Sequence, residues 1–253
     1  MTDAIVLAGG RDPDLEAGIP NKAFIQIDGR PLVAFVVEAL RGSRGIGQIA
    51  VAGPSTELSQ CFPSGILIVP DQNTIMENIL AATRSLGSST PTLVVGADIP
   101  LLTGRVIEEF LSICAQTPAD VYYPVVPQVE METRFPGVRK TYVRVIEGAL
   151  CGGSVLFLNP EVLVRLRPFV ERILAARKQP WVLAQIFGWS IVLKLAAGRL
   201  SIDELVGKTT ELTGLTVKPV IVPLPELALD VDSGKPENLQ LIQAALGSRH
   251  PVP

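Results

Sequence analysis

Residues 4–11 read Ala4-Ile5-Val6-Leu7-Ala8-Gly9-Gly10-Arg11, and a lysine follows at Lys22. The apolar run predicts a buried strand, and the two glycines predict a loop whose backbone N–H groups can approach an anion closely. Lys22 can return to the same place as a point charge. We therefore predict a phosphate site at the carboxyl edge of a parallel sheet, which is where α/β folds usually bind ligands.

Strand and helix patterns alternate over the first half of the chain. Five apolar runs are continuous, which is typical of strands covered on both faces, and helical patterns lie between them. The expected strands are Ala4–Leu7, Gln48–Ala52, Ile66–Val69, Thr92–Val95 and Asp120–Val125, and the expected helices are Val33–Leu40, Ile75–Leu86 and Val106–Ala115. This order predicts an α/β fold of three layers, α/β/α, with a mostly parallel twisted sheet in the middle.

The pattern changes after Val125. Three prolines, Pro124, Pro127 and Pro136, predict a polar loop there. The segments expected after it are strands at Tyr142–Ile146 and Ser154–Leu158, a long helical stretch, a strand at Val217–Val222 and a helix at Pro236–Leu246. We expect a single domain over residues 1–253, a helical insertion at 159–214 and a flexible tail at 247–253.

Composition narrows the classes of protein and of site. A net charge of −3, 5% aromatic residues and no block of Lys and Arg argue against a nucleic-acid partner. Cys61, Cys114 and Cys151 lie far apart, which argues against a zinc site and fits a cytoplasmic protein. The only histidine is His250, so carboxylates must hold any metal, which favours Mg²⁺ (or Mn²⁺) over zinc.

Two carboxylate positions are candidates for metal ligation. Asp98 follows an apolar run, and a buried Asp is costly unless it is paired, hydrogen-bonded or bound to metal. Its alternative role, capping the next helix, is better suited to Thr103. Asp230 and Asp232 alternate along an extended segment, so one can face the site while the other faces away. The alternative for this pair is a solvated turn.

Four segments, in their order along the chain, carry a resemblance to a known family. They are Leu7-Ala8-Gly9-Gly10, Lys22 with Gly29-Arg30-Pro31-Leu32, Ala97-Asp98-Ile99-Pro100-Leu101, and Asp230-Val231-Asp232. They resemble the GT-A-type nucleotidyltransferases, and most closely the MobA-like NTP transferases. That group includes molybdenum-cofactor guanylyl- and cytidylyltransferases, methylerythritol-phosphate cytidylyltransferase and sugar-phosphate nucleotidyltransferases. The resemblance implies the GT-A-like nucleotide-diphospho-sugar transferase fold.

The resemblance also implies roles for individual residues. Lys22, Asp98 and Asp232 would be catalytic, and the metal would be held by Asp98 and Asp232, with Asp230 beside them. The nucleotide would contact Leu7, Ala8, Gly9, Gly10, Arg11, Lys22, Asp71, Thr74, Asn78 and Ala97. For Thr74 an equal alternative is a helix cap formed with Glu77. The choice of CTP, GTP or another nucleotide stays open, because the base-reading segment lacks the customary glycines.

Several features point to the second substrate. Arg139 and Lys140 lie in a cluster with Arg134 and Arg144 and could grip an acceptor phosphate. A solvated basic loop is the alternative. Gly152 and Gly153, at the entry to a strand, would allow an acceptor to approach closely.

Residues 181–198 read WVLAQIFGWSIVLKLAAG, a length near the lower limit for a membrane span. Gln185, Lys194 and charged flanks oppose a span. A buried helix or the face of a homodimer is one alternative. Another is peripheral membrane contact through an interfacial helix that admits a lipid-linked acceptor.

Three hypotheses of function follow. The first is a metal-dependent nucleotidyltransferase that couples an NTP to a phosphorylated small-molecule or lipid acceptor and releases pyrophosphate. The second is a GT-A glycosyltransferase that uses a nucleotide-sugar, which the glycine loop and Lys22 disfavour. The third is a non-catalytic nucleotide-binding module, which the acidic residues of the loop at 12–20 favour.

Overall fold

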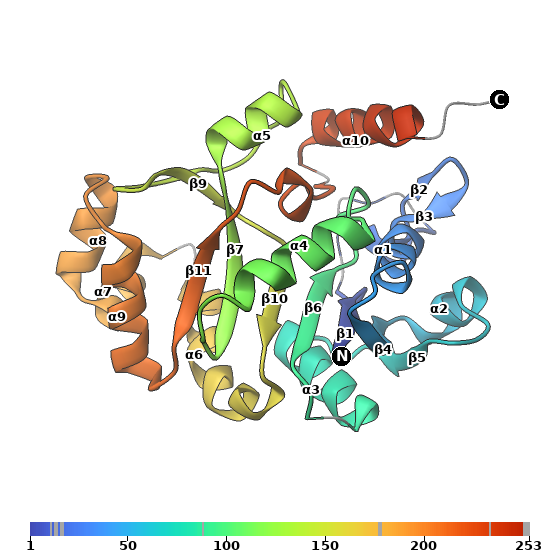
Figure 1. Ribbon diagram of the computed structural model, residues 1–253, viewed down its shortest axis with the longest axis horizontal. Coiled ribbons are helices and arrows are strands. Elements are labelled where there is room, and N and C mark those ends of the chain that lie inside the picture. The colour runs from blue at the N-terminus through green and yellow to red at the C-terminus, as the bar shows by residue number, and fades with distance from the viewer. Residues whose placement is uncertain are drawn as a thin grey trace.

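A nine-stranded mixed sheet runs through the molecule (Figure 1). The structure is a computed structural model, and it describes residues 1–10, 12, 15, 18–87, 89–176, 179–232 and 234–249. Its strands are β1 (Thr2–Leu7), β4 (Ile46–Gly53), β5 (Leu67–Pro70), β6 (Thr92–Gly96), β7 (Val121–Pro127), β8 (Val143–Val145), β9 (Gly148–Gly152), β10 (Val155–Leu158) and β11 (Val217–Ile221). Their order in space is β5-β4-β1-β6-β10-β7-β9-β8, and β11 pairs with β7. A short separate ribbon joins β2 (Gln26–Ile27) to β3 (Arg30–Pro31).

The strand directions bring the predicted site residues to one edge. Strand β1 pairs in parallel with β4 and β6, and β5 pairs in parallel with β4. Strand β11 is parallel to β7, whereas β10 runs antiparallel between β6 and β7, and β9 runs antiparallel to β7 and β8. The carboxyl ends of β1 and β6 therefore lie side by side, so that the loops after them meet.

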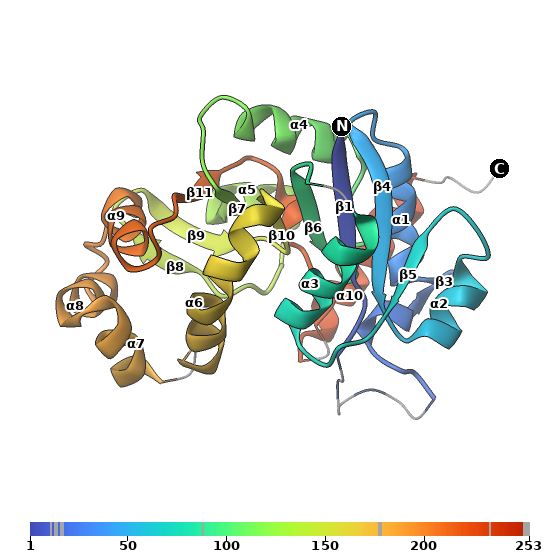
Figure 2. The same cartoon turned by 90° about the horizontal axis from the view of Figure 1, so that it is seen from below.

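Helices cover both faces of this sheet (Figures 1 and 2). Helices α1 (Leu32–Arg41) and α4 (Gly104–Cys114) pack on the face that carries Val6 and Val95. Helices α3 (Ile75–Leu86) and α6 (Leu163–Ala176) pack on the face that carries Ile5 and Val94. Neighbouring residues of a strand point to opposite faces, so both faces of the central strands are apolar and covered. The prediction of three layers around a mostly parallel sheet is confirmed.

Caps begin the two helices that follow β5 and β6. Thr74 Oγ1 accepts a hydrogen bond from the Glu77 N–H (3.2 Å), and Thr103 Oγ1 accepts one from the Val106 N–H (3.3 Å). Helix α3 ends at Gly87, whose φ of 62° is left-handed. Thr103 therefore takes the capping role that was the alternative for Asp98.

The interval after β7 differs from its prediction. Helix α5 (Gln128–Arg134) and strand β9 lie where a polar loop and only one strand were expected. Met131 explains the helix, because this side chain is fully buried and holds one face of α5 against the core. Helix α2 (Ser55–Cys61) was also missed. Helix α10 (Pro236–Arg249) continues beyond Leu246, so the tail predicted to start at 247 is wrong for 247–249, and residues 250–253 lie outside the described residues.

Between β10 and β11 the described chain forms a short 3-10 helix, η2 (Pro160–Val162), and the helices α6, α7 (Pro180–Phe187), α8 (Trp189–Ala196) and α9 (Ile202–Thr213). Gly188, with a φ of 91°, divides the apolar segment 181–198 into α7 and α8. Trp181, Trp189 and Leu193 are exposed, and none of the fully described residues of α8 is buried. The buried-helix alternative is therefore wrong for α8. In the described part of the chain no helix is long and apolar enough to cross a membrane.

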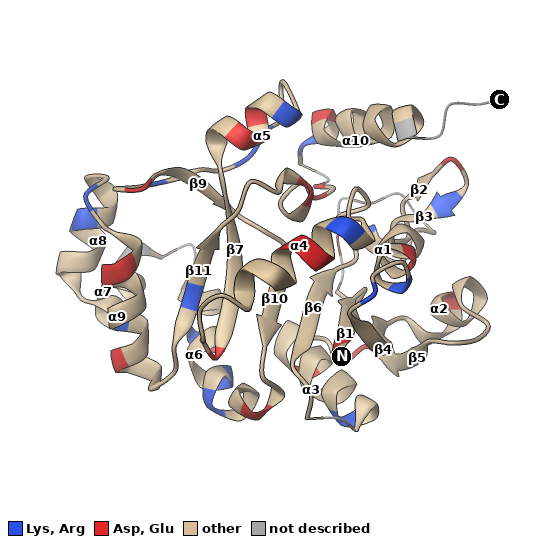
Figure 3. Cartoon of the chain, viewed as in Figure 1, with Lys and Arg blue, Asp and Glu red and all other residues tan. Residues whose placement is uncertain are grey.

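Charged residues of both signs are spread over the helices and loops, and few of them lie on the strands of the sheet (Figure 3). This distribution agrees with a sheet that is covered on both faces.

Candidate active site

A pocket of about 930 Å³ opens at the carboxyl edge of β1 and β6. It is lined by the loop after β1, the 3-10 helix η1 (Lys22–Phe24), the end of β6, the entry to β10 and part of α6. The predicted site residues among its lining are Leu7, Ala8, Gly9, Gly10, Lys22, Ala97, Asp98 and Gly153. The fold thus gathers segments that are far apart in the sequence. Arg11, also predicted here, lies outside the described residues.

Asn21 fixes the position of Lys22. The buried Asn21 side chain donates to the Ala8 carbonyl (2.8 Å) and accepts from the Ala23 N–H (2.9 Å). One side chain therefore ties the end of β1 to the start of η1, with Lys22 between them. We did not predict this role, although Asn before a short helix is a recognisable cap signal.

Asp71 and Asn78 lie behind the glycine loop. The Gly10 N–H donates to Asp71 Oδ2 (3.1 Å), and the Asn78 side-chain amide donates to Asp71 Oδ1 (2.9 Å). Asn78 Oδ1 in turn accepts from the Gln72 N–H (2.7 Å). A Cβ on Gly9 would lie 2.7 Å from Asp71 Oδ1 and 2.8 Å from Asn78 Nδ2. These two residues, predicted to contact the nucleotide, thus brace the loop, and the predicted phosphate ligand Gly10 N–H is bonded to Asp71.

Asp98 occupies the floor of the pocket after β6. Its backbone carbonyl accepts from the Val231 N–H (2.8 Å), which holds the segment of Asp230 and Asp232 against it. Burial, and after it the nearby charge of Asp230, raises the pKa of Asp98 from 3.8 to a net value of about 6, while Lys22 and Lys140 oppose the rise. The Lys140 ammonium donates to Asp230 Oδ1 (2.7 Å).

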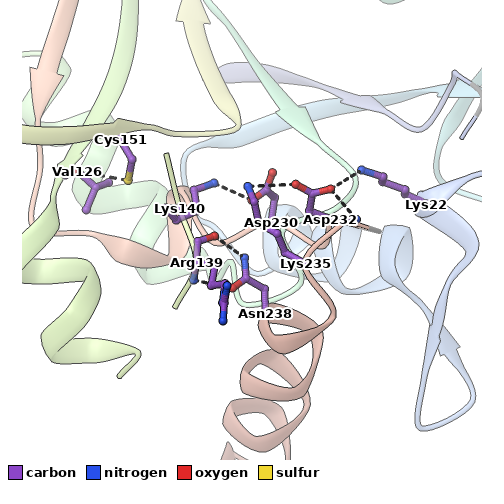
Figure 4. Close-up of polar contacts among 10 residues, drawn as sticks. Lys22, Val126, Arg139, Lys140, Cys151, Asp230, Asp232, Lys235 and Asn238 are labelled. Atoms are coloured by element: carbon purple, nitrogen blue, oxygen red, sulfur yellow. Dashed lines mark hydrogen bonds and ion pairs between the residues drawn. The ribbon is translucent and has the colours of Figure 1, made fainter. Parts of the chain in front are cut away.

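Asp232 faces the other side of the same segment. Its carboxylate lies 3.7 Å from Lys22 Nζ and 3.2 Å from Lys235 Nζ (Figure 4). Burial raises the pKa of Asp232, but hydrogen bonds from Lys235 and the Gly234 N–H, together with Lys22, outweigh burial and leave this pKa below its usual value. Asp230 and Asp232 therefore pair with different lysines, Lys140 and Lys22, and of these two partners Lys22 lines the pocket. Lys22 also lies 3.6 Å from Asp12.

Gly152 makes room for Tyr123, and Gly153 makes room for the backbone of Leu227. A Cβ on Gly152 would lie 1.9 Å from the Tyr123 hydroxyl oxygen, and a Cβ on Gly153 would lie 2.9 Å from the Leu227 carbonyl. Tyr123 lines the pocket beside Gly153 and Ser154. Burial raises the pKa of Tyr123, and the charges of Cys151 and Asp230 add to the rise. No sequence signal singled out Tyr123, because an aromatic residue within a strand is ordinary.

Three of the four basic residues predicted to bind the acceptor phosphate form ion pairs with carboxylates of the chain. Arg139 is exposed and pairs with Glu237 (3.3 Å), Arg134 pairs with Glu226 (3.4 Å), and Lys140 pairs with Asp230. Arg144 is exposed on β8. Among the described residues that line the pocket, Lys22 is the only one with a basic side chain. The structure therefore does not bring these four cations together as a single grip on the pocket.

Comparisons with known proteins agree with this geometry. Residues 4–179 match the family of MobA-like NTP transferase domains. A solved structure described as a hypothetical transferase from Thermus thermophilus is 34% identical, with a TM-score of 0.84 over 94% of this chain and 99% of that one.

Two further relatives carry names that describe a nucleotide reaction. The 2-C-methyl-D-erythritol 4-phosphate cytidylyltransferase of Frankia casuarinae is 28% identical over 127 residues, which are 49% of this chain and 47% of that protein. The match thus spans about half the length of this curated relative. A CMP:2-keto-3-deoxy-manno-octonic acid synthetase, solved with CTP, has a TM-score of 0.61 at 15% identity over 99% of this chain and all of its own. That similarity shows a shared fold.

Proposed function

This chain belongs to the family of MobA-like NTP transferase domains, and from that premise we propose that it is a metal-dependent nucleotidyltransferase. It would couple an NTP to a phosphorylated acceptor and release pyrophosphate. The observation that supports this reaction is the convergence of the glycine loop, Lys22 and Asp98 on one pocket, with Asp232 paired to Lys22. Two relatives are named for cytidylyl transfer or were solved with CTP, so CTP is the first nucleotide to test.

The carboxylates of the site suit a divalent cation. Asp98 would be one ligand of Mg²⁺ (or Mn²⁺), and Asp230 or Asp232 the second. Asp230 lies close enough to raise the pKa of Asp98, so a cation shared by these groups would relieve their repulsion. The described residues contain no cluster of three or more His, Cys, Asp or Glu side chains suited to a metal, so phosphate oxygens and water would complete the shell. Bound there, the ion would neutralise charge on the phosphates.

The chain's own groups would position the reactants and balance charge. Lys22, held between Asp12 and Asp232, would face the α-phosphate. An oxygen of the acceptor phosphate would form the new bond to the α-phosphorus as the bond to pyrophosphate breaks. Because a phosphate dianion carries no proton on the attacking oxygen, this step needs no general base. Positioning and electrostatic stabilisation supply most of the acceleration in such transfers.

Pyrophosphate release tests the proposal. Each of the four NTPs is incubated with MgCl₂ and a panel of phosphorylated acceptors. We expect release with the wild type and a loss of at least about 100-fold in Lys22→Ala and Asp98→Ala, with thermal unfolding still cooperative. Lys208→Ala is the matched control, because Lys208 pairs with Glu211 on α9 and does not line the pocket.

The same assay separates the alternatives. Unchanged turnover in both pocket variants would refute the mechanism. Release of a nucleoside diphosphate from a nucleotide-sugar would identify a glycosyltransferase instead. Binding of NTP that needs no Mg²⁺ and leads to no turnover would identify a binding module.

A further inference from the structure

The pocket that contains Lys22 and Asp98 has an apolar end. Val170 and Leu174, one helical turn apart on α6, line it together with Leu156 of β10 and Ile75 of α3. Leu174 keeps 37% and Ile75 49% of its surface exposed. Large apolar side chains therefore remain uncovered inside a pocket, which favours an apolar group as part of the ligand.

The order of the strands places the α6 part of this end on the side of β10, whereas Ile75 borders it from α3. The brace of the glycine loop comes from Asp71, at the end of β5, and the loop itself follows β1. Asp98 follows β6, and β10 and β7 lie beyond it in the sheet order β5-β4-β1-β6-β10-β7. Helix α6 follows β10 in the chain after the short helix η2, and its Leu163 and Leu166 belong to the same apolar cluster as Leu158 of β10 and Val121 of β7. A nucleotide on the β1 side would thus leave the α6 wall for the second substrate.

Charge on this side is low. Lys22 is the single basic side chain among the described lining residues, and it belongs to the nucleotide half. Arg139 and Lys140 are held in ion pairs with Glu237 and Asp230. Beyond Asp98 the polar groups of the lining are the hydroxyls of Tyr123 and Ser154. A multiply charged acceptor would find no cation there, whereas a single phosphate near Lys22 and a neutral, apolar body would fit.

The wall is held in place before any ligand binds. Arg167 of α6 pairs with Glu77 of α3 at 2.5 Å, which ties the two helices that border the apolar end. Phe169 of α6 packs edge-on against Phe187 of α7, with ring centroids 5.9 Å apart. Pre-organised apolar surface lowers the entropy cost of binding.

We infer that the acceptor is an amphiphile, a phosphomonoester whose apolar chain lies against Val170 and Leu174 of α6. This inference rests on the proposed nucleotidyl transfer, and it names the substrate class of the same site. The phosphate would sit at Lys22 and Asp98, and the chain would run away from the sheet edge along α6.

A series of alkyl phosphates tests it. Butyl, hexyl and octyl phosphate are compared with glycerol phosphate below their micelle concentrations, with the NTP that gives turnover and MgCl₂. We expect KM to fall by about two- to fourfold per added methylene, with little change in kcat. Leu174→Asp should abolish this dependence on chain length and leave the KM for the NTP unchanged, and Leu174→Ser should weaken it.

Val164→Asp is the matched control, because Val164 lies on the same helix and is 76% exposed. Its chain-length dependence should equal that of the wild type. Turnover that is equal for glycerol and octyl phosphate, or chain-length dependence that survives in Leu174→Asp, overturns the inference while the proposed function stands. Calorimetric binding of octyl phosphate that Leu174→Asp abolishes, without turnover of any acceptor, overturns the proposed reaction and supports the apolar site.

A final arm distinguishes the two sources of such a molecule. Dodecyl phosphate is presented in neutral phosphatidylcholine vesicles and, separately, as the free monomer. Turnover from the vesicles supports the inference with a membrane lipid as acceptor, and turnover of the monomer alone supports it with a soluble amphiphile. No turnover of dodecyl phosphate in either form, while polar phosphates react, contradicts the inference of an amphiphilic acceptor.

Discussion

The Lys140 ammonium donates a 2.7 Å hydrogen bond to Asp230, and Asp230 is the carboxylate that, after burial, raises the pKa of Asp98. Three segments far apart in the chain thus bring Lys140, Asp230 and Asp98 together at the sheet edge. Asp232 forms a second charged group with Lys22 and Lys235 (Figure 4). Most of these groups are partly exposed, so each pair contributes only about 0–1 kcal/mol to folding. The larger effect of these charges is on the pKa of Asp98, which Asp230 raises and Lys22 and Lys140 lower.

Replacing Lys140 should move the pH profile of the reaction. Lys140 lowers the pKa of Asp98, so Lys140→Met should raise this pKa above its value of about 6. The acidic limb of kcat/KM for pyrophosphate release should then shift to higher pH by about half a unit, roughly 0.7 kcal/mol. Arg139→Met is the control, because Arg139 pairs with Glu237 and should leave the limb in place. Equal limbs in all three proteins would contradict this coupling.

Asp98 should reduce stability at neutral pH. Its pKa is about 6 in the folded chain and ordinarily 3.8. The folded state therefore binds the proton more tightly, and stability falls as pH rises between these two values. The free energy of unfolding of Asp98→Asn should equal that of the wild type below about pH 4. Above pH 6 it should exceed that of the wild type by about 1–2 kcal/mol, allowing for solvent screening. Urea unfolding at several pH values measures this difference.

The same pair of proteins tests the metal. MgCl₂ at pH 8 should raise the urea midpoint of the wild type, because binding to the folded state alone is stabilising. It should leave Asp98→Asn unchanged. An equal response in both proteins would exclude Asp98 as a ligand.

The Gly9 position should be intolerant of a side chain. A Cβ there would approach Asp71 Oδ1 at 2.7 Å and Asn78 Nδ2 at 2.8 Å. Gly9→Ala should therefore displace the brace of the loop, destabilise the fold by about 1–3 kcal/mol and raise the KM for the NTP. The double variant Gly9→Ala with Asp71→Ala should lose less folding stability than the sum of the two single variants, because Asp71→Ala removes the nearest clash. Strict additivity in urea unfolding would show that this contact does not matter.

Gly152 should control the position of Tyr123. A Cβ at Gly152 would lie 1.9 Å from the Tyr123 hydroxyl oxygen, so Gly152→Ala must move that ring. We expect the KM for the acceptor to rise at least about threefold, a cost of at least ~0.7 kcal/mol, with the KM for the NTP unchanged. In the double variant Gly152→Ala with Tyr123→Ala the clash disappears. Gly152→Ala should therefore raise the KM for the acceptor less in the Tyr123→Ala background than it does alone. A rise in both KM values would point to general distortion.

Much of the fold could be read from the chain. Apolar runs such as Ala4–Leu7 and Thr92–Val95 have no polar face to expose, so they became central strands covered by helices. Thr74 and Thr103 begin helices because their side-chain oxygens can accept hydrogen bonds from the free N–H groups of a first turn. Helix α5 was missed because its single buried anchor, Met131, gives no visible period among polar neighbours.

By itself the sequence determined which residue types the chain can offer to chemistry, and in what local setting. The chain has a single histidine, at position 250, so the chemistry that we propose rests on carboxylates and Lys22, and Asp98 follows an apolar strand. The tertiary structure alone decided the partners. Asp71 bonds to the Gly10 N–H across 61 residues of sequence, and Lys140 bonds to Asp230 across 90. Leu174 lines the same pocket as Lys22. No local sequence pattern encodes these contacts. The physical reason is that strand order and helix packing set these distances, and both arise from burial of apolar surface over the whole chain rather than from the residues that come together.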